Sequence, residues 1–159
     1  MRRDHETGTA LLKTIIGVCV AMLGSASLLI VGLATRPAGG LSLPAGYKVV
    51  HVEEYDYGIR IDGPVPSGNV VFVDTNRGTI PHELVVFQTK GADAPMPVLR
   101  DQTLNEDSDQ LDSVMDSGSS LNPGETRLLT ADLDPGTYIA VCNLPAHFHF
   151  GMQRRFTIG

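Results

Sequence analysis

The sequence predicts an all-β domain, a two-sheet sandwich with Greek-key connections, that follows an N-terminal transmembrane helix. After residue 46, short runs rich in Val, Ile, Phe, Tyr and Thr alternate with turns rich in Gly, Pro, Asn and Asp. No helical periodicity is sustained there, and about seven short strands in roughly 115 residues are typical of a β-sandwich. An uncharged apolar run precedes this region.

That apolar run covers residues 14–35, and its length matches the hydrocarbon core of a bilayer. The basic residues Arg2, Arg3 and Lys13 precede it, as expected for a cytoplasmic flank. We therefore expect residues 1–13 to be cytoplasmic and residues 14–35 to be an uncleaved signal anchor.

The remaining chain then lies outside the membrane, in the periplasm or the extracellular space. The small-x-small sequence Gly32-Leu33-Ala34 leaves signal-peptide cleavage open, which would make the protein secreted. Residues 36–46, rich in Gly, Pro and Ala, read as a linker, and residues 47–159 as the folded domain.

Each predicted strand is bounded by turn residues, for example Asp134-Pro135-Gly136, which suits a tight turn. The predicted strands are Tyr47–Tyr55, Gly58–Ile61, Val70–Thr75, Glu83–Thr89, Thr126–Leu133, Thr137–Cys142 and Arg155–Ile158. In the sixth of these, Tyr138, Ala140 and Cys142 share one face, because side chains alternate along a strand.

The segment from Lys90 to Leu121 is polar, so we expect it to lie outside the core, with a short helix near Gln110–Met115. From residue 36 onward nine basic residues face sixteen acidic ones, a net charge of 9 − 16 = −7, which argues against nucleic acid as a partner. Six acidic residues fall within 101–116, which contains no base: Asp101, Glu106, Asp107, Asp109, Asp112 and Asp116. Such a segment is a solvated loop or a docking surface for a basic partner.

Cys142, His147 and Met152 offer a thiolate, an imidazole and a thioether within one short loop. Thiolate and thioether favour copper, particularly Cu(I), and imidazole suits both oxidation states. The only other cysteine, Cys19, lies in the apolar run, so Cys142 has no disulfide partner in the exported domain. A lone cysteine in an exported protein is a reactive liability, an intermolecular crosslink or a metal ligand, and the structural alternative is a small buried hydrophobic residue.

His82 is the candidate for a second imidazole ligand. His5 is on the cytoplasmic side, His51 lies among charged residues, and His149 is too close to His147 to bind the same metal. His82 follows a turn at the start of a predicted strand, where an ordinary strand-edge histidine is the alternative.

With these residues, the chain resembles the small cupredoxins of the plastocyanin/azurin class. The resemblance rests on Asn76–Leu84, which contains His82, and on the Cys-x4-His-x4-Met spacing of Cys142–Met152, closest to rusticyanin- and sulfocyanin-like members. It covers Gly46–Gly159 and implies a single type 1 copper ion. By this resemblance, His82, Cys142 and His147 are ligands, Met152 is the axial ligand, and there are no catalytic residues.

Two features depart from the family pattern. Glu83 stands where many relatives have Asn, whose amide braces the cysteine loop, and a carboxylate cannot donate that hydrogen bond unless it is protonated. Phe148, His149 and Phe150 add two aromatic rings and an imidazole near the site. They form either a hydrophobic rim that limits water access or a docking face for a redox partner.

We expect an electron carrier that cycles between Cu(I) and Cu(II) and has no small-molecule substrate. Its partners would be transient redox proteins of the cytochrome or oxidase type, and the acidic surface permits basic ones. An enzyme is disfavoured, because Cys142 is flanked by Val141 and Asn143 rather than by histidines, and the chain has no second copper domain. The alternatives are a non-redox module for copper storage, delivery or resistance, and, more weakly, a structural zinc site.

Overall fold

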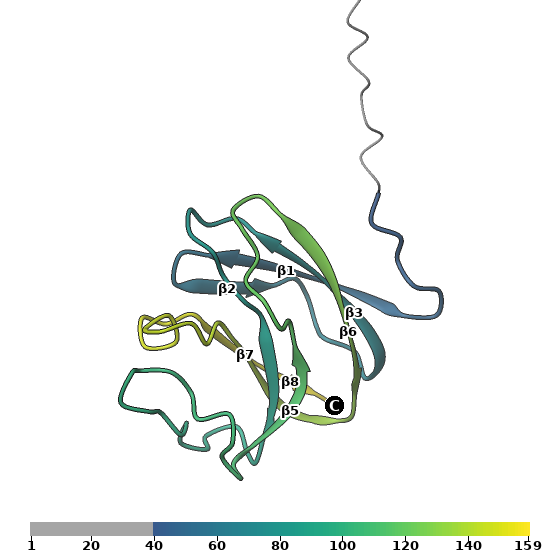
Figure 1. Ribbon diagram of the computed structural model, residues 1–159. Helices are drawn as coiled ribbons and strands as arrows, with labels where there is room; N and C mark the ends of the chain where they lie inside the picture. The colour runs from purple at the N-terminus through teal and green to yellow at the C-terminus, as the bar shows by residue number, and fades with distance from the viewer. Residues whose placement is uncertain (1–39) are drawn as a thin grey trace, which may run out of the picture. The chain divides into compact units, whose positions relative to one another are not determined.

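Two four-stranded β-sheets pack face to face in the computed structural model, which describes residues 40–159 (Figure 1). The strands are β1 (Lys48–Tyr55), β2 (Gly58–Ile61), β3 (Gly68–Asn76), β4 (Val85–Thr89), β5 (Leu111–Asp116), β6 (Thr126–Leu133), β7 (Gly136–Val141) and β8 (Gln153–Ile158). The first sheet has the order β2-β1-β3-β6 and the second the order β5-β4-β7-β8. The prediction of an all-β, two-sheet fold is confirmed.

The chain crosses from one sheet to the other after β3, β5 and β6. Neighbouring strands run antiparallel except for β1 and β3, which pair in parallel. The crossing after β3 contains His82, and the turn between β7 and β8 contains Cys142, His147 and Met152. The fold therefore brings these two distant segments to one end of the sandwich.

The core lies between the sheets and has a second part on the outer face of the second sheet. Alternate residues of β7 point to the two parts: Tyr138 and Ala140 belong to the inner core, whereas Ile139 and Val141 belong to the outer cluster. Cys142 continues the inward-facing row and is fully buried. The predicted alternation along this strand is confirmed.

All seven predicted strands are present, with ends shifted by at most two residues, but the predicted helix near 110–115 is wrong. Residues Leu111–Asp116 form β5, the edge strand of the second sheet. The pairing of β5 with β4 shifts between Val86 and Phe87, which skips Val114. This bulge turns Leu111 toward the outer cluster and Met115 toward the inner core.

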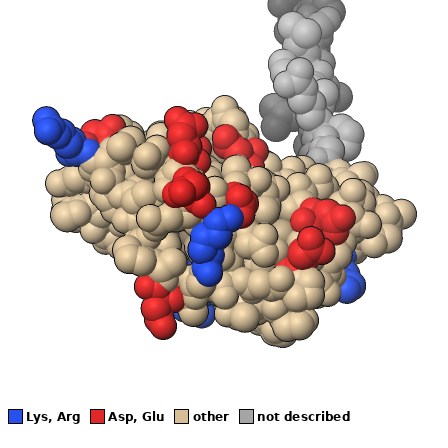
Figure 2. Space-filling model, turned by 90° about the horizontal axis from the view of Figure 1, so that it is seen from below, with Lys and Arg blue, Asp and Glu red and all other residues tan. Residues whose placement is uncertain are grey.

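The segment 90–121 was expected to lie outside the core, and this is also wrong. Leu104 and Leu111 are buried against the outer face of the second sheet, together with Phe87 and Ile139. The six acidic side chains of 101–116 are all exposed. On the face drawn in Figure 2, acidic side chains stand in separate groups, and some of these groups lie next to Lys or Arg side chains.

Within residues 40–159 there is no helix that could span a bilayer. The predicted anchor at 14–35 and the cytoplasmic residues 1–13 lie outside the described residues.

Candidate metal centre

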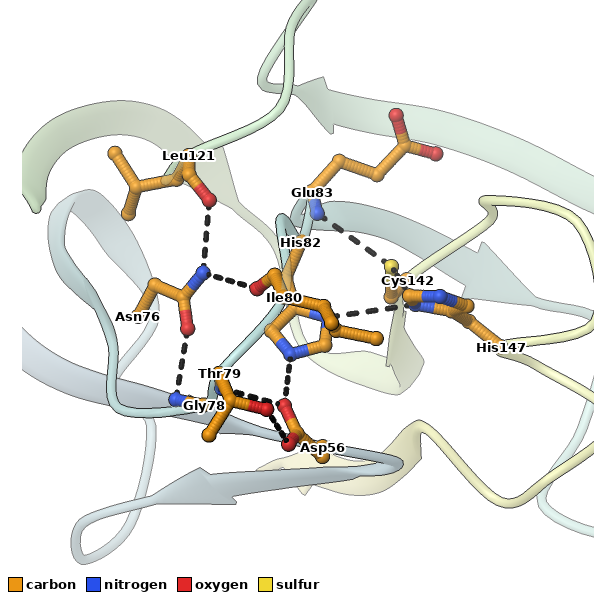
Figure 3. Close-up of polar contacts among 10 residues, drawn as sticks. All are labelled: Asp56, Asn76, Gly78, Thr79, Ile80, His82, Glu83, Leu121, Cys142 and His147. Atoms are coloured by element: carbon orange, nitrogen blue, oxygen red, sulfur yellow. Dashed lines mark hydrogen bonds and ion pairs between the residues drawn. The ribbon is translucent and has the colours of Figure 1, made fainter. Parts of the chain in front are cut away.

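His82, Cys142 and His147 converge at one end of the sandwich, with their ligand atoms all within 4.8 Å of one another (Figure 3). The Nδ1 atoms of His82 and His147 are 3.3 Å apart, and Cys142 Sγ lies 3.2 Å from His147 Nδ1. His82 and Cys142 are fully buried, whereas His147 is partly exposed. One sulfur and two imidazole nitrogens thus face a common point.

The turn between β7 and β8 is closed by its own backbone. The N–H of Cys142 donates to the carbonyl of Met152 at 3.1 Å, and the N–H of Met152 donates to the carbonyl of His147 at 3.0 Å. Ala146 has a φ of 70°, a left-handed conformation that is uncommon outside glycine and is enriched at functional sites. Met152 is fully buried in the inner core beside Cys142.

His82 precedes β4 and is held by an isolated bridge to Leu121, with two backbone hydrogen bonds of 3.1 and 2.6 Å. The buried side chain of Asn76 supports the same turn. Its Nδ2 donates to the carbonyls of Ile80 and Leu121, and its Oδ1 accepts the N–H of Gly78. These bonds satisfy the amide and fix the path of the chain into His82.

The second nitrogen of His82 faces a carboxylate. Nε2 lies 3.2 Å from Oδ1 of Asp56, which is in the turn between β1 and β2. Thr79 holds that carboxylate with its backbone N–H and its hydroxyl, at 2.8 and 2.6 Å. These hydrogen bonds lower the pKa of Asp56 to about 2, so it is ionised at neutral pH.

One backbone N–H group faces the sulfur of Cys142, that of Glu83, which lies 3.4 Å from Sγ. Burial nevertheless raises the pKa of the Cys142 thiol to about 11. Without a metal, Cys142 is therefore a protonated thiol at neutral pH.

Glu83 does not supply the side-chain donor that an amide would supply. Burial raises the pKa of the Glu83 carboxyl, assisted by the charges of Asp116 and Glu106. The link between Glu83 and the cysteine loop is its backbone N–H, which lies 3.4 Å from Cys142 Sγ.

Burial lowers the pKa of both imidazoles. The charge of His147 lowers the pKa of His82 further. Asp56 opposes the shift in both cases. The two rings are therefore neutral at pH 7, which is the form that binds a metal.

The predicted aromatic rim is only partly correct. Phe150 is 61% exposed and His149 is exposed, but Phe148 is buried in the outer cluster. Tyr57 takes its place, with its ring centroid 5.7 Å from that of His147 and 5.2 Å from that of Phe150. Tyr57 has a φ of 66°, so this ring is presented from a left-handed turn residue.

A buried acidic pair lies on the inner side of the first sheet. Glu54 and Asp74 are both inaccessible to solvent, and Arg127 Nε pairs with Asp74 Oδ2 at 2.9 Å. Burial, and then the charge of Asp74, raise the pKa of Glu54 to about 8. Burial also raises the pKa of Asp74, and Arg127 opposes it. At neutral pH Glu54 is therefore mainly the neutral acid, and it lies beside the ion pair of Asp74 with Arg127.

These donors fit a copper ion. Nitrogen and thiolate ligands stand about 2.0–2.3 Å from a metal, so two of them on one ion are separated by roughly 3–4 Å. The separations of 3.2 and 3.3 Å between donor atoms agree with this range. A trigonal set of two His and one Cys is the ligand set of blue-copper sites.

Asp56, Asn76 and Tyr57 were not identified as functional residues from the sequence. Each lies in a turn or strand end whose place beside His82 or His147 depends on tertiary structure. One sequence signal was available for Asn76, because Asn followed two residues later by Gly is typical of a side chain that folds back onto its own turn.

No protein-family model matches the sequence, and no curated protein matches it. Among solved structures, auracyanin B is 21% identical, with a TM-score of 0.52 over 74% of this chain and 91% of that one. Sodium-dithionite-reduced auracyanin from the photosynthetic bacterium Roseiflexus castenholzii is 21% identical over 72% of this chain and 99% of its own, with a TM-score of 0.49. Rusticyanin from Thiobacillus ferrooxidans is 22% identical over 70% of this chain and 78% of its own, with a TM-score of 0.47.

Multicopper oxidases also occur among the similar structures. The match to the multicopper oxidase from Pediococcus acidilactici covers only 28% of that enzyme's chain. The auracyanins and rusticyanin are cupredoxins, and the likeness to auracyanin B shows that the described domain has the cupredoxin fold.

Proposed function

We propose that this protein is an electron carrier with one copper ion, bound by His82, Cys142 and His147 and capped by Met152. The observation that carries the proposal is the convergence of one thiol and two neutral imidazoles within 4.8 Å at a buried end of the fold. Copper in such a site supplies a one-electron change between Cu(II) and Cu(I).

The residues around the site favour this role by limiting movement. The loop from Cys142 to Met152 is fixed at both ends by β7 and β8, and a hydrogen bond joins its first and last residues. His82 is fixed by Leu121 and Asn76. A ligand set that is held in place by the fold changes little between two oxidation states, which suits fast electron transfer.

His147 is the partly exposed member of the three, and its ring contacts that of exposed Tyr57, which in turn contacts exposed Phe150. We infer that electrons enter and leave through this edge, where a transient redox partner of the cytochrome or oxidase type would dock. The excess of acidic residues outside residues 1–35 suits a partner with a basic surface.

The proposal includes attachment to the outer face of a membrane by residues 14–35, because that run is uncharged and long enough to span a bilayer. Fractionation of cells that express the full chain tests this part. Recovery in the membrane fraction after a high-salt wash supports the anchor, and recovery of a shortened soluble form supports cleavage.

Voltammetry of the copper-loaded protein, combined with a Cu(I) chelator, tests the redox role. A carrier gives a reversible one-electron wave and keeps its copper through repeated cycles with the chelator present. A storage or delivery module releases copper to the chelator when reduced, and this result would contradict the carrier.

A further inference from the structure

We propose that Asp56 is a positioning residue that sets the donor strength of His82 and lowers the reduction potential of the site. This inference rests on the proposed function and concerns the regulation of the same site. It is carried by the contact between Asp56 Oδ1 and His82 Nε2 at 3.2 Å, on the side of the ring opposite the other ligands (Figure 3).

The tautomer of His82 follows from its two neighbours. Nδ1 faces His147 and the common point of the donor atoms, so it must carry the lone pair that binds a metal. The ring proton then lies on Nε2 and is donated to Asp56. Carboxylate partners of this kind fix ring orientation and raise the basicity of a metal-bound histidine.

Asp56 is itself held in place, although part of it reaches solvent. The backbone N–H and hydroxyl of Thr79 occupy its two oxygens, and the carboxylate side chain is 34% exposed. Because Thr79 lies only three residues before His82, one short turn fixes both partners of the contact.

Gly78 provides a second and independent observation. A Cβ at this position would lie 2.3 Å from Asp56 Oδ1 and 2.6 Å from His82 Nε2. The backbone thus comes so close to the carboxylate–imidazole pair that any side chain would separate it. The glycine is required here by space, since its φ is not in the left-handed region.

A hydrogen-bonded negative charge stabilises Cu(II) more than Cu(I), because the ion with the higher charge gains more from a strong donor and from a nearby anion. Removing the charge should therefore weaken Cu(II) binding while affecting Cu(I) little. Mutation of a residue that hydrogen-bonds to a metal-binding histidine typically costs 10–100-fold in metal affinity.

The test compares Asp56→Asn with the wild-type full-length chain. Asn keeps the size and an acceptor oxygen but removes the charge. We expect the variant to remain coloured with Cu(II), to bind Cu(II) about tenfold more weakly and to have a reduction potential higher by about 59 mV, the value for a tenfold change in a one-electron couple. Pulsed EPR should show altered quadrupole couplings of the remote nitrogen of one histidine.

Asp62→Asn is the matched control. Asp62 is an exposed carboxylate that follows β2, at the opposite end of the β1–β2 hairpin, and pairs with Arg60. The Asp62→Asn substitution removes the same charge far from His82. The reduction potential and the nitrogen couplings of this variant should therefore match those of the wild type. If the two variants shift the potential equally, or if Asp56→Asn leaves the nitrogen couplings unchanged, the proposal is overturned.

Gly78→Ala tests the contact without changing any charge. The added methyl group should displace the carboxylate from the ring and shift the potential upward, in the same direction as Asp56→Asn. A Gly78→Ala variant with the wild-type potential and couplings would contradict the proposed contact.

A measurement on the unmodified protein covers the case in which either variant does not fold. In NMR spectra of the reduced protein, the Nε2 proton of His82 should give a slowly exchanging, downfield resonance, and its absence would overturn the proposal. Failure of the wild type itself to form a coloured site would instead overturn the proposed function, so the two failures are distinguishable.

Discussion

The side chain of Asn143 pairs with both backbone groups of Leu104, accepting its N–H at Oδ1 at 2.6 Å and donating from Nδ2 to its carbonyl at 3.2 Å. Nδ2 also donates to Glu106. Asn143 directly follows Cys142, so the metal loop is joined to the segment that covers the outer face of the second sheet.

Asn143→Ala should therefore lower the free energy of unfolding by about 1–3 kcal/mol, because it leaves the backbone groups of buried Leu104 without partners. Urea denaturation of the metal-free protein measures the change. Asn105→Ala is the control, since its side chain makes no hydrogen bond within residues 40–159. Equal stability of the two variants would contradict the role of Asn143.

The contacts of Asn76 lead to a second prediction, which concerns the rate of copper dissociation. Its fully buried amide makes three hydrogen bonds in the turn that leads to His82. Asn76→Ala should lower stability by about 1–3 kcal/mol and speed copper dissociation, because His82 loses its support. Stopped-flow transfer of copper to a chelator measures the rate, and an unchanged rate would show that Leu121 alone fixes His82.

Metal binding should release protons. Burial raises the pKa of Cys142 to about 11, and the pKa values of His82 and His147 are lowered, so at pH 7 the proton that must leave the metal-free site is the one on sulfur. Because a thiolate is required for binding, each Cu(II) ion should release close to one proton. Titration in weak buffer with a pH indicator measures this, and the absence of release would mean that the thiol is not a ligand.

The buried pair of Glu54 and Asp74 predicts how stability depends on pH. The pKa of Glu54 is about 8 in the folded state, above its ordinary value of 4.5, so the folded state binds more protons between these two pH values. Stability should then fall as pH rises through this window, by up to about 1.4 kcal/mol per pH unit for one proton.

Glu54→Gln should remove most of this slope, because a neutral amide replaces the protonated acid at all pH values. Thermal unfolding of both proteins between pH 5 and 9 makes the comparison. A variant with the same slope as the wild type would assign the effect to another group.

The fold was predictable because most strands are short runs rich in β-branched and aromatic residues, bounded by turn residues. Thr126–Leu133, for example, was predicted with the same bounds as β6. The strand β5 was missed because it lies in a polar segment and because its bulge interrupts the alternation of faces. Leu111, Val114 and Met115 have the spacing of a helix face, yet they contact two different clusters of the core.

The four proposed ligands were identifiable because three of them lie close together in sequence. The structure brings His82 to Cys142 and His147, while their assignment as copper ligands stays a prediction. Asp56 could not be inferred, since its distance from His82 depends on how the β1–β2 turn meets the crossing after β3. An exposed aspartate in a hairpin turn has no sequence feature that distinguishes it from other turn residues.

The most direct test of the electron-carrier proposal is the visible spectrum of the Cu(II)-loaded protein, recorded beside that of Cys142→Ser. We predict an intense blue or green charge-transfer band that ascorbate bleaches and that the variant lacks. A colourless protein that still binds Cu(I) tightly would contradict the electron carrier and support copper storage or delivery.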